Sequence, residues 1–394
     1  MRMILMSFAF AGLAVWFYLI VFHGGFWRLT ERDGNFAPPG APAPVEVTVT
    51  AIIPARDEAD VIGQCLSSLL AQEFSGRLDI VLVDDQSTDD TAEAARACAA
   101  ARDAAERLTV LTTEGPACGW TGKLAAMQRG FDHVRSRPKA PDFLLFCDAD
   151  IAFGPAALER LATGALARKT VLASLMVKLR CESAAERWFV PAFVFFFQML
   201  YPFARVNDPK SRVAAAAGGV MLVRPEPLAR AGGLAAIRGA LIDDCALGAL
   251  MKHQGPIWLG LTDAVHSLRP YPGFKDIERM VTRSAYAQLN YSPLRLFGAI
   301  LSMIVVYLAP PLIAVLGEAP ARDAALVAYL LMAQAYMPSL RFYGLSRPDA
   351  LALPLVAACY TWFILESARQ HMNGRGGAWK GRYQAPASGQ DFEP

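Results

Sequence analysis

Residues 46–180 alternate short apolar runs with stretches in which apolar residues recur every three to four positions. The short runs are rich in β-branched residues and predict strands, whereas the periodic stretches predict helices. The predicted strands cover 47–54, 79–85, 108–113 and 143–147, and the predicted helices cover 61–72, 90–101, 123–134 and 155–167. Such alternation indicates right-handed crossover units, so we expect an α/β fold with a mostly parallel central sheet.

Long apolar runs lie at both ends of the chain. Residues 3–22 form an uncharged run long enough to cross a bilayer. Trp27 and Arg28 after it favour a retained anchor over a cleaved signal peptide. Three further candidate spans cover 296–316, 324–344 and 350–367, the first kinked by Pro310 and Pro311. The predicted organisation is an anchor (1–28), a Pro-rich linker (29–45), a globular domain (46–292), membrane segments (293–368) and a basic tail (369–394).

The predicted number of membrane spans conflicts with the positions of the basic residues near the C-terminus. Arg341, Arg347 and the basic tail are all expected in the cytosol by the positive-inside rule. Three full crossings after a cytosolic domain would leave the tail outside. Either one segment is re-entrant or the rule fails at the tail, and we favour a re-entrant or interfacial segment. The aromatic run 188–203 is either a buried core helix or a helix at the membrane surface.

Composition supports a soluble domain combined with a few membrane segments. Hydrophobic residues make up 54% of the 394 residues and charged residues 19%. Because 38 basic residues nearly balance 36 acidic ones, there is no electrostatic case for nucleic acid. The seven cysteines are odd in number and include no C-x-x-C, so we expect buried free thiols rather than disulfides or a zinc site.

Three polar clusters follow predicted strands. They are Pro54-Ala55-Arg56-Asp57-Glu58, the acidic run 84–91, and Asp148-Ala149-Asp150. Each alone could be a turn or a helix cap. Together they favour one ligand site at the carboxyl edge of the sheet. Two carboxylates one residue apart can hold a divalent cation against a diphosphate. No Walker A or G-x-G-x-x-G sequence occurs, so P-loop and dinucleotide-binding folds lack support.

Two further features suit the same chemistry. Asp243 and Asp244 lie about ninety residues after the third cluster. Paired acids often decorate a helix N-terminus for structural reasons alone. Lys123 opens a predicted helix in a glycine-bearing turn, which suits a phosphate, or it is a solvated helix-start lysine.

The order PARDE, VDDQSTDDT and CDAD resembles that of inverting family 2 glycosyltransferases with the GT-A fold. The resemblance implies that Asp85 contacts the uracil and ribose of the donor, with the PARDE segment, Pro54 included, near the nucleotide. It implies that Asp148 and Asp150 bind the diphosphate and Mg²⁺ or Mn²⁺. Asp244 matches the general base and Asp243 the acid before it.

The resemblance also extends to the acceptor side and to a later motif. Gly218 and Gly219 resemble the acceptor-side segment, where glycines allow close backbone approach. Arg283 matches the arginine of a Q/R-x-x-R-W motif and could bind diphosphate, or lie on a solvated helix face. Met280 and Ser284 depart from that motif, which weakens the case for polymer synthesis.

A closer resemblance covers most of the chain. The runs AAAAGGVMLVRPEPLARAGG, ALIDDCALGAL, RPYPGF and RSAYAQLNYSP are similar to bacterial hopene-associated glycosyltransferases, which are similar to ceramide glucosyltransferases. This implies a nucleotide-sugar donor (a UDP-sugar), a hopanoid-type membrane lipid as acceptor, and an inner-membrane protein whose catalytic domain faces the cytosol. The alternatives are a polysaccharide synthase and a catalytically silent membrane-anchored binding protein.

Overall fold

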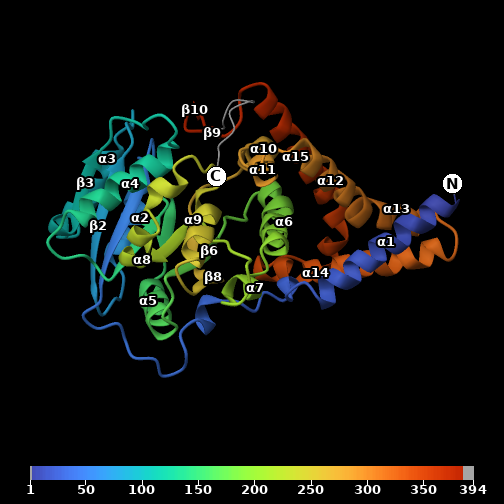
Figure 1. Ribbon diagram of the computed structural model, residues 1–394, viewed down its shortest axis with the longest axis horizontal. Coiled ribbons are helices and arrows are strands. Elements are labelled where there is room, and N and C mark those ends of the chain that lie inside the picture. Colours follow the sequence, from blue (N-terminus) through green and yellow to red (C-terminus); the bar gives the residue numbers. More distant parts are fainter. Residues whose placement is uncertain (1, 385–394) are drawn as a thin grey trace. The chain divides into compact units, whose positions relative to one another are not determined.

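The computed structural model describes residues 2–384, which divide into two compact units (Figure 1). The sheet unit comprises Thr30–Arg180 and Phe203–Pro270. The helical unit takes the described residues of Met1–Leu29, Cys181–Pro202 and Tyr271–Pro394. The first residue of the predicted anchor and residues 385–394 of the predicted basic tail lie outside the described residues.

The sheet unit is built on eight strands in the order β3-β2-β1-β4-β7-β6-β8-β5. Strands β1 to β4 pair only in parallel with one another, and β6 is parallel to β8. Strand β7 is antiparallel to β4 and β6, and β5 is antiparallel to β8, so the sheet is mixed beyond its parallel half. The strands are β1 Thr48–Ala55, β2 Arg77–Asp84, β3 Leu108–Thr112, β4 Phe143–Cys147, β5 Ile151–Phe153, β6 Leu172–Lys178, β7 Val220–Val223 and β8 Ile257–Ser267.

The helices of the sheet unit follow the strands as the pattern predicts. All four predicted strands and all four predicted helices are confirmed, with bounds that differ by at most two residues. The helices are α2 Ile62–Leu70, α3 Thr91–Ala100, α4 Gly122–Arg135, α5 Ala157–Ala167, α7 Phe203–Asn207, α8 Pro225–Arg230 and α9 Asp243–Lys252.

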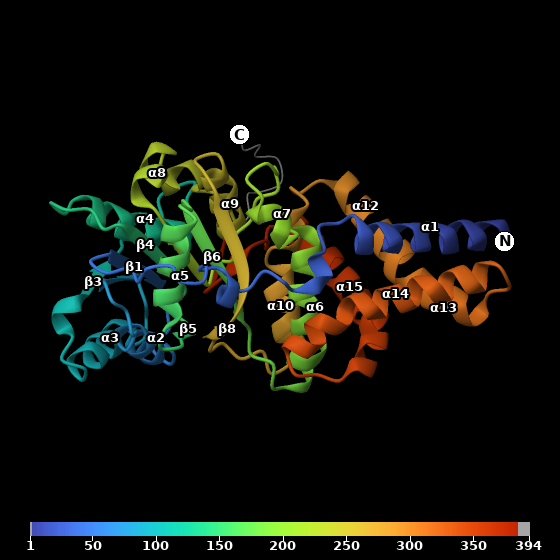
Figure 2. The same cartoon turned by 90° about the horizontal axis from the view of Figure 1, so that it is seen from below.

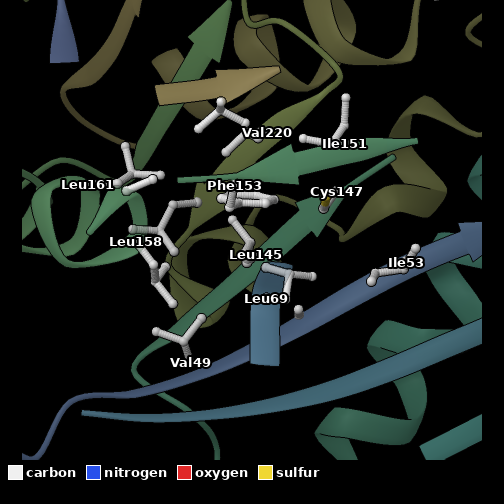
Figure 3. Close-up of a cluster of buried hydrophobic side chains, with 14 of the residues drawn as sticks. Val49, Ile53, Leu69, Leu145, Cys147, Ile151, Phe153, Leu158, Leu161 and Val220 are labelled. Carbon is white, nitrogen blue, oxygen red and sulfur yellow. The ribbon is translucent and has the colours of Figure 1, made fainter. Parts of the chain in front are cut away.

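Alternation along the strands divides the core between two faces of the sheet. Val49 and Ile53 of β1 lie on the face that packs against α2 and α5 (Figure 3). Ile52 points to the other face, where α4 lies close to β1. A Cβ on Gly130 of α4 would stand 2.5 Å from Ile52 Cγ2, so this close packing requires glycine. The seven cysteines are free, as expected, but only Cys65 and Cys147 are buried, and Cys118 is exposed.

The helical unit contains the apolar termini. Helices α1, α13 and α14 lie side by side, and Ala9 packs against Ile313 and Ala325 (Figure 2). A short π-helical turn, Ile304–Leu308, joins α12 to α13. The elements are α1 Arg2–Val21, α6 Ala184–Leu200, α10 Phe274–Thr282, α11 Ala285–Gln288, α12 Pro293–Met303, α13 Ala309–Leu316, α14 Ala321–Phe342, α15 Leu353–Met372, β9 Ala378–Trp379 and β10 Arg382–Tyr383.

The prolines predicted to kink the segment 296–316 leave backbone carbonyls without their usual helical donors. Pro310 has no N–H to offer the carbonyl of Val306, four residues earlier. The indole N–H of buried Trp16 in α1 donates to this carbonyl instead, at 2.8 Å. The Trp16 side chain therefore repairs a defect that proline creates in an apolar helix.

Three stretches of the described helices are long and apolar enough to cross a membrane: Arg2–Val21, Pro293–Leu316 and Arg347–Met372. They match three of the four predicted spans and indicate a membrane protein. The fourth, 324–344, forms α14 but does not meet the same criterion, and Arg322, Asp323 and Arg341 place charges near its ends. The aromatic run 188–203 lies mostly in α6, which buries Phe189 and Phe195 and leaves Trp188 about half exposed.

Candidate functional site

The loops after β1 and β2 are tied to each other at the carboxyl edge of the sheet. The backbone N–H of Asp57 donates to Ser87 Oγ at 3.0 Å, and Asp57 Oδ1 accepts from the backbone N–H of Thr88 at 2.7 Å. Arg56 Nη1 donates to the carbonyl of Asp85 at 2.6 Å. The first two polar clusters of the sequence therefore converge, as the parallel strands predict.

The remaining predicted donor residues of this corner are buried. The carboxylate of Asp85 is almost fully buried and accepts from Thr113 Oγ1 at 2.9 Å, which links the ends of β2 and β3. Pro54 is buried inside β1, opposite Val83. The carboxylate of Asp85 is thus held in place by Thr113. Pro54 lies inside β1, just before the loop that carries Arg56 and Asp57.

Lys123 joins the third polar cluster to Asp243, the acid before the predicted base. It is the second residue of α4, whose N-cap Thr121 accepts from the backbone N–H of Leu124. Its ammonium lies 2.8 Å from Asp148 Oδ1 and 3.0 Å from Asp243 Oδ2. Burial by itself would lower the pKa of Lys123, but the charges of these two carboxylates outweigh it and raise the pKa. Lys123 is therefore a permanent cation inside an acidic site.

Asp244 begins α9 together with Asp243. Its Oδ2 accepts from the backbone N–H of Gly218 at 2.9 Å, and its Oδ1 accepts from that of Cys245 at 2.7 Å. Burial raises the pKa of Asp244 to about 6, the charge of Asp243 adds to the shift, and Lys123 opposes it. A carboxylate with this pKa can accept a proton near neutral pH, as a general base must.

The two predicted acceptor-side glycines contact this acidic site. A Cβ on Gly218 would stand 3.2 Å from Lys123 Nζ and 3.4 Å from Asp244 Oδ2, so a larger residue would push against both. The carbonyl of Gly219 accepts from the backbone N–H of Asp148 at 3.3 Å. The backbone at these glycines therefore lies close to the acidic site, and its approach to an acceptor stays a prediction.

Arg269 completes the site and was not among the predicted site residues. It follows β8, which pairs with β5 so that Ser267 faces Ile151, and this register brings Arg269 to Asp150. Its Nε donates to Asp150 Oδ2 at 2.8 Å, and its Nη2 donates to both oxygens of Glu58 at 2.8 Å. Burial would lower the pKa of Arg269, but the charges of Asp150 and Glu58 raise it.

The signal that could have identified Arg269 is its place in the sequence. An arginine directly after a long apolar strand lies at a sheet edge, where the acidic clusters also lie. Which edge it reaches depends on the pairing of β8 with β5, and local sequence does not reveal that pairing. Glu58, predicted to lie near the nucleotide, is buried and engaged by this arginine.

The residues present fit a divalent cation that shares its coordination with a phosphate. Among residues 2–384, no three His, Cys, Asp or Glu side chains form a protein-only metal cage. Mg²⁺, however, typically takes one or two carboxylates and completes its shell with water and substrate phosphates. Asp148 and Asp150 offer such carboxylates. The site also carries more negative than positive charge. Its two cations are Lys123 and Arg269, and its five carboxylates are those of Glu58, Asp148, Asp150, Asp243 and Asp244.

Arg283 belongs to the helical unit, where it caps the C-terminus of α10. Its predicted contact with the donor diphosphate therefore stays a prediction. All the other predicted site residues lie in the sheet unit.

The fold is that of the GT-A nucleotide-sugar transferases. The mannosyltransferase PcManGT from Pyrobaculum calidifontis, solved in complex with GDP-Man and Mn²⁺, superposes with a TM-score of 0.53 at 19% sequence identity, covering 93% of this chain and 98% of that one. The family model described as "Glycosyl transferase family 2" matches residues 50–231, from the third residue of β1 to the residue after α8. Residues 50–231 thus match glycosyltransferase family 2, and this match supports a glycosyltransferase.

Curated relatives are similar to part of the chain. The 4,4'-diaponeurosporenoate glycosyltransferase of Staphylococcus aureus (strain bovine RF122 / ET3-1) is 35% identical over 107 residues, which are 27% of this chain and 24% of the relative. The same enzyme from strain MRSA252 is 35% identical over 106 residues, with the same coverage. The similarity thus spans about a quarter of the length of these relatives.

Proposed function

We propose that the protein moves a sugar from a nucleotide-diphosphate sugar, a UDP-sugar, to the hydroxyl of a membrane lipid, with inversion at the anomeric carbon. The lipid is of the hopanoid or glycolipid class, and the catalytic domain faces the cytosol at the inner membrane. The observation that carries the proposal is Lys123, which lies between Asp148 of the D-A-D cluster and Asp243 of the base pair of acids. This arrangement supports a leaving-group site that lies beside the acids of the proposed base.

Each step has a residue suited to it. The acceptor oxygen attacks the anomeric carbon while the bond from that carbon to the diphosphate oxygen breaks, and the nucleoside diphosphate leaves. Asp244 takes the hydroxyl proton, for which its pKa of about 6 is suitable. Lys123 offers a buried positive charge to the departing diphosphate. Asp85, Arg56 and Asp57 form the part of the sheet edge proposed for the nucleoside.

Asp148 and Asp150 are the residues proposed to hold Mg²⁺ or Mn²⁺. When bound, the cation neutralises charge on the departing diphosphate. The negative surplus of the site supports this cofactor, because an anionic donor would otherwise enter an already anionic edge. Removal of divalent cations with EDTA is expected to abolish transfer, and full activity after thorough chelation would contradict the cofactor.

The acceptor is proposed to be a hydroxyl for a reason in the site itself. The curated relatives are named for a carotenoid acceptor, 4,4'-diaponeurosporenoate, whose name ends as a carboxylate. A carboxylate acceptor is already deprotonated and needs no general base. The raised pKa of Asp244 suits a hydroxyl, which must lose a proton during attack.

The test uses the purified full chain in detergent with a panel of radiolabelled nucleotide sugars and a hopanoid-containing lipid extract. Labelled lipid is expected with one donor and is expected to disappear in Asp244→Asn, while nucleotide binding persists. Asp103→Asn is the matched control, because Asp103 is exposed in a left-handed turn that asparagine also adopts. Equal transfer by Asp244→Asn and the wild type would remove Asp244 as the base. Sugar incorporation into a long polymer would instead favour a polysaccharide synthase, and no transfer with any donor would favour a silent binding protein.

A further inference from the structure

Both carboxylates proposed to hold the divalent cation are already paired with a cation of the protein. Lys123 Nζ lies 2.8 Å from Asp148 Oδ1, and Arg269 Nε lies 2.8 Å from Asp150 Oδ2. The two pairs come from different elements, α4 and the segment after β8. Each half of the D-A-D cluster therefore has its own counter-ion.

Arg269 is held in this position from a second side. Its Nη2 donates to both oxygens of Glu58, whose backbone N–H in turn donates to Thr91 Oγ1 at 2.9 Å. Asp150 is fixed as well, because its carbonyl accepts from the backbone N–H of Leu268 at 2.7 Å. The carboxylates of Glu58 and Asp150 are buried, whereas 37% of the Arg269 side chain is exposed. The guanidinium is thus anchored at one edge while part of it remains accessible.

We propose that Arg269 is a positioning residue that suppresses divalent-cation binding at Asp150 until the donor diphosphate arrives. A cation bound at Asp150 would lie within a few ångströms of the guanidinium, and like charges at that separation repel strongly in a partly buried site. A diphosphate offers Arg269 an anionic partner, which relieves this competition. Donor and cation then strengthen each other's binding, and by reciprocity the coupling is equal in both directions. This inference rests on the proposed function, because it assumes that Asp150 takes the cation.

The experiment measures Mn²⁺ binding to the purified full chain by electron paramagnetic resonance, with and without uridine diphosphate. Arg269→Gln removes the charge at similar size, and we expect it to bind Mn²⁺ alone at least about tenfold more tightly than the wild type. Arg269→Lys keeps the charge and is expected to stay within a few-fold of the wild type. Uridine diphosphate is expected to tighten Mn²⁺ binding more in the wild type than in Arg269→Gln.

Arg77→Gln is the matched control. Arg77 also donates from Nε to an aspartate, Asp79, but it lies exposed at the opposite end of β2 from the carboxyl edge. The Mn²⁺ affinity of the Arg77→Gln variant is expected to equal that of the wild type. The titration gives the number of sites separately from the affinity, so partial unfolding of a variant lowers the number of sites and not the affinity. Arg269→Ala provides a second variant in case glutamine impairs folding.

An unchanged Mn²⁺ affinity in Arg269→Gln and Arg269→Ala would overturn the inference. A weaker affinity would also overturn it, since Arg269 would then support the cation site as an outer-shell partner. Failure of the wild type and all variants to bind Mn²⁺ at millimolar concentration, even with uridine diphosphate, would overturn the cofactor in the proposed function and this inference with it. The two failures are therefore distinguishable.

Discussion

Replacing Lys123 is expected to shift the pH dependence of transfer through its effect on Asp244. Lys123 Nζ and Asp244 Oδ2 lie 3.2 and 3.4 Å from the same point, the place of a Cβ on Gly218. They are therefore no more than about 7 Å apart, and at that separation two unit charges interact by roughly 0.6–2.4 kcal/mol for effective dielectric constants of 80 to 20. One pKa unit corresponds to about 1.4 kcal/mol.

Lys123→Met removes a cation that lowers the pKa of Asp244. The pKa is expected to rise from about 6 by roughly half a unit to two units. Because Asp244 must be deprotonated to act as a base, the acid limb of the pH–rate profile should move upward by the same amount. The assay is the initial rate of sugar transfer from pH 5 to 9 at saturating donor and divalent cation.

Two comparisons separate this electrostatic effect from damage to the fold. Lys123→Met leaves half-buried Asp148 and buried Asp243 without their cation. Loss of the partner costs about 3–5 kcal/mol in fully buried pairs, so the thermal midpoint is measured alongside. Lys123→Arg keeps the charge and should leave the acid limb in place. Lys139→Met, at an exposed position, is the control. An acid limb of Lys123→Met that coincides with that of the wild type, in protein that remains folded, would refute the reasoning.

Three further changes test the packing around the site and the membrane helices. Gly218→Ala should reduce kcat by tenfold or more while nucleotide binding persists. The added methyl group would press against Lys123 and Asp244, and such overpacking costs about 1–3 kcal/mol. An unchanged kcat would contradict the close approach. Glu186→Gln should destabilise the chain by about 1–3 kcal/mol in thermal unfolding, since this buried carboxylate accepts from three backbone N–H groups, and Glu226→Gln at an exposed position is its control. Trp16→Phe should cost about 1–2 kcal/mol, because the carbonyl of Val306 loses its donor, and an unaltered unfolding midpoint would argue against that role.

Local pattern was sufficient for the parallel half of the sheet. Strands β1 to β4 and the helices after them carry clear periodicity, and parallel strands must present their carboxyl ends at one edge. The convergence of Asp57, Asp85 and Asp148 at that edge could therefore be predicted before any coordinates. The later strands differ, because β7 inserts between β4 and β6 in the antiparallel sense, and short apolar runs do not encode which distant strand they will pair with.

The same limit explains what was missed at the site. Arg269 reaches Asp150 only because β8 pairs with β5, more than one hundred residues earlier, in one particular register. A shift of that register by one residue would turn the side chains of the strand to the opposite faces. The partner of Lys123 was likewise unpredictable, since a lysine at a helix start suits a phosphate and a carboxylate equally.

Asp243 and Asp244 illustrate how environment separates two neighbouring acids that the sequence presents as a pair. Asp243 lies 3.0 Å from the ammonium of Lys123 and forms an ion pair with it. Asp244 instead accepts two backbone hydrogen bonds, and burial raises its pKa to about 6. Asp244 can therefore take a proton from an acceptor hydroxyl near neutral pH. This difference supports Asp244 as the base, with Asp243 holding Lys123 in place for the diphosphate.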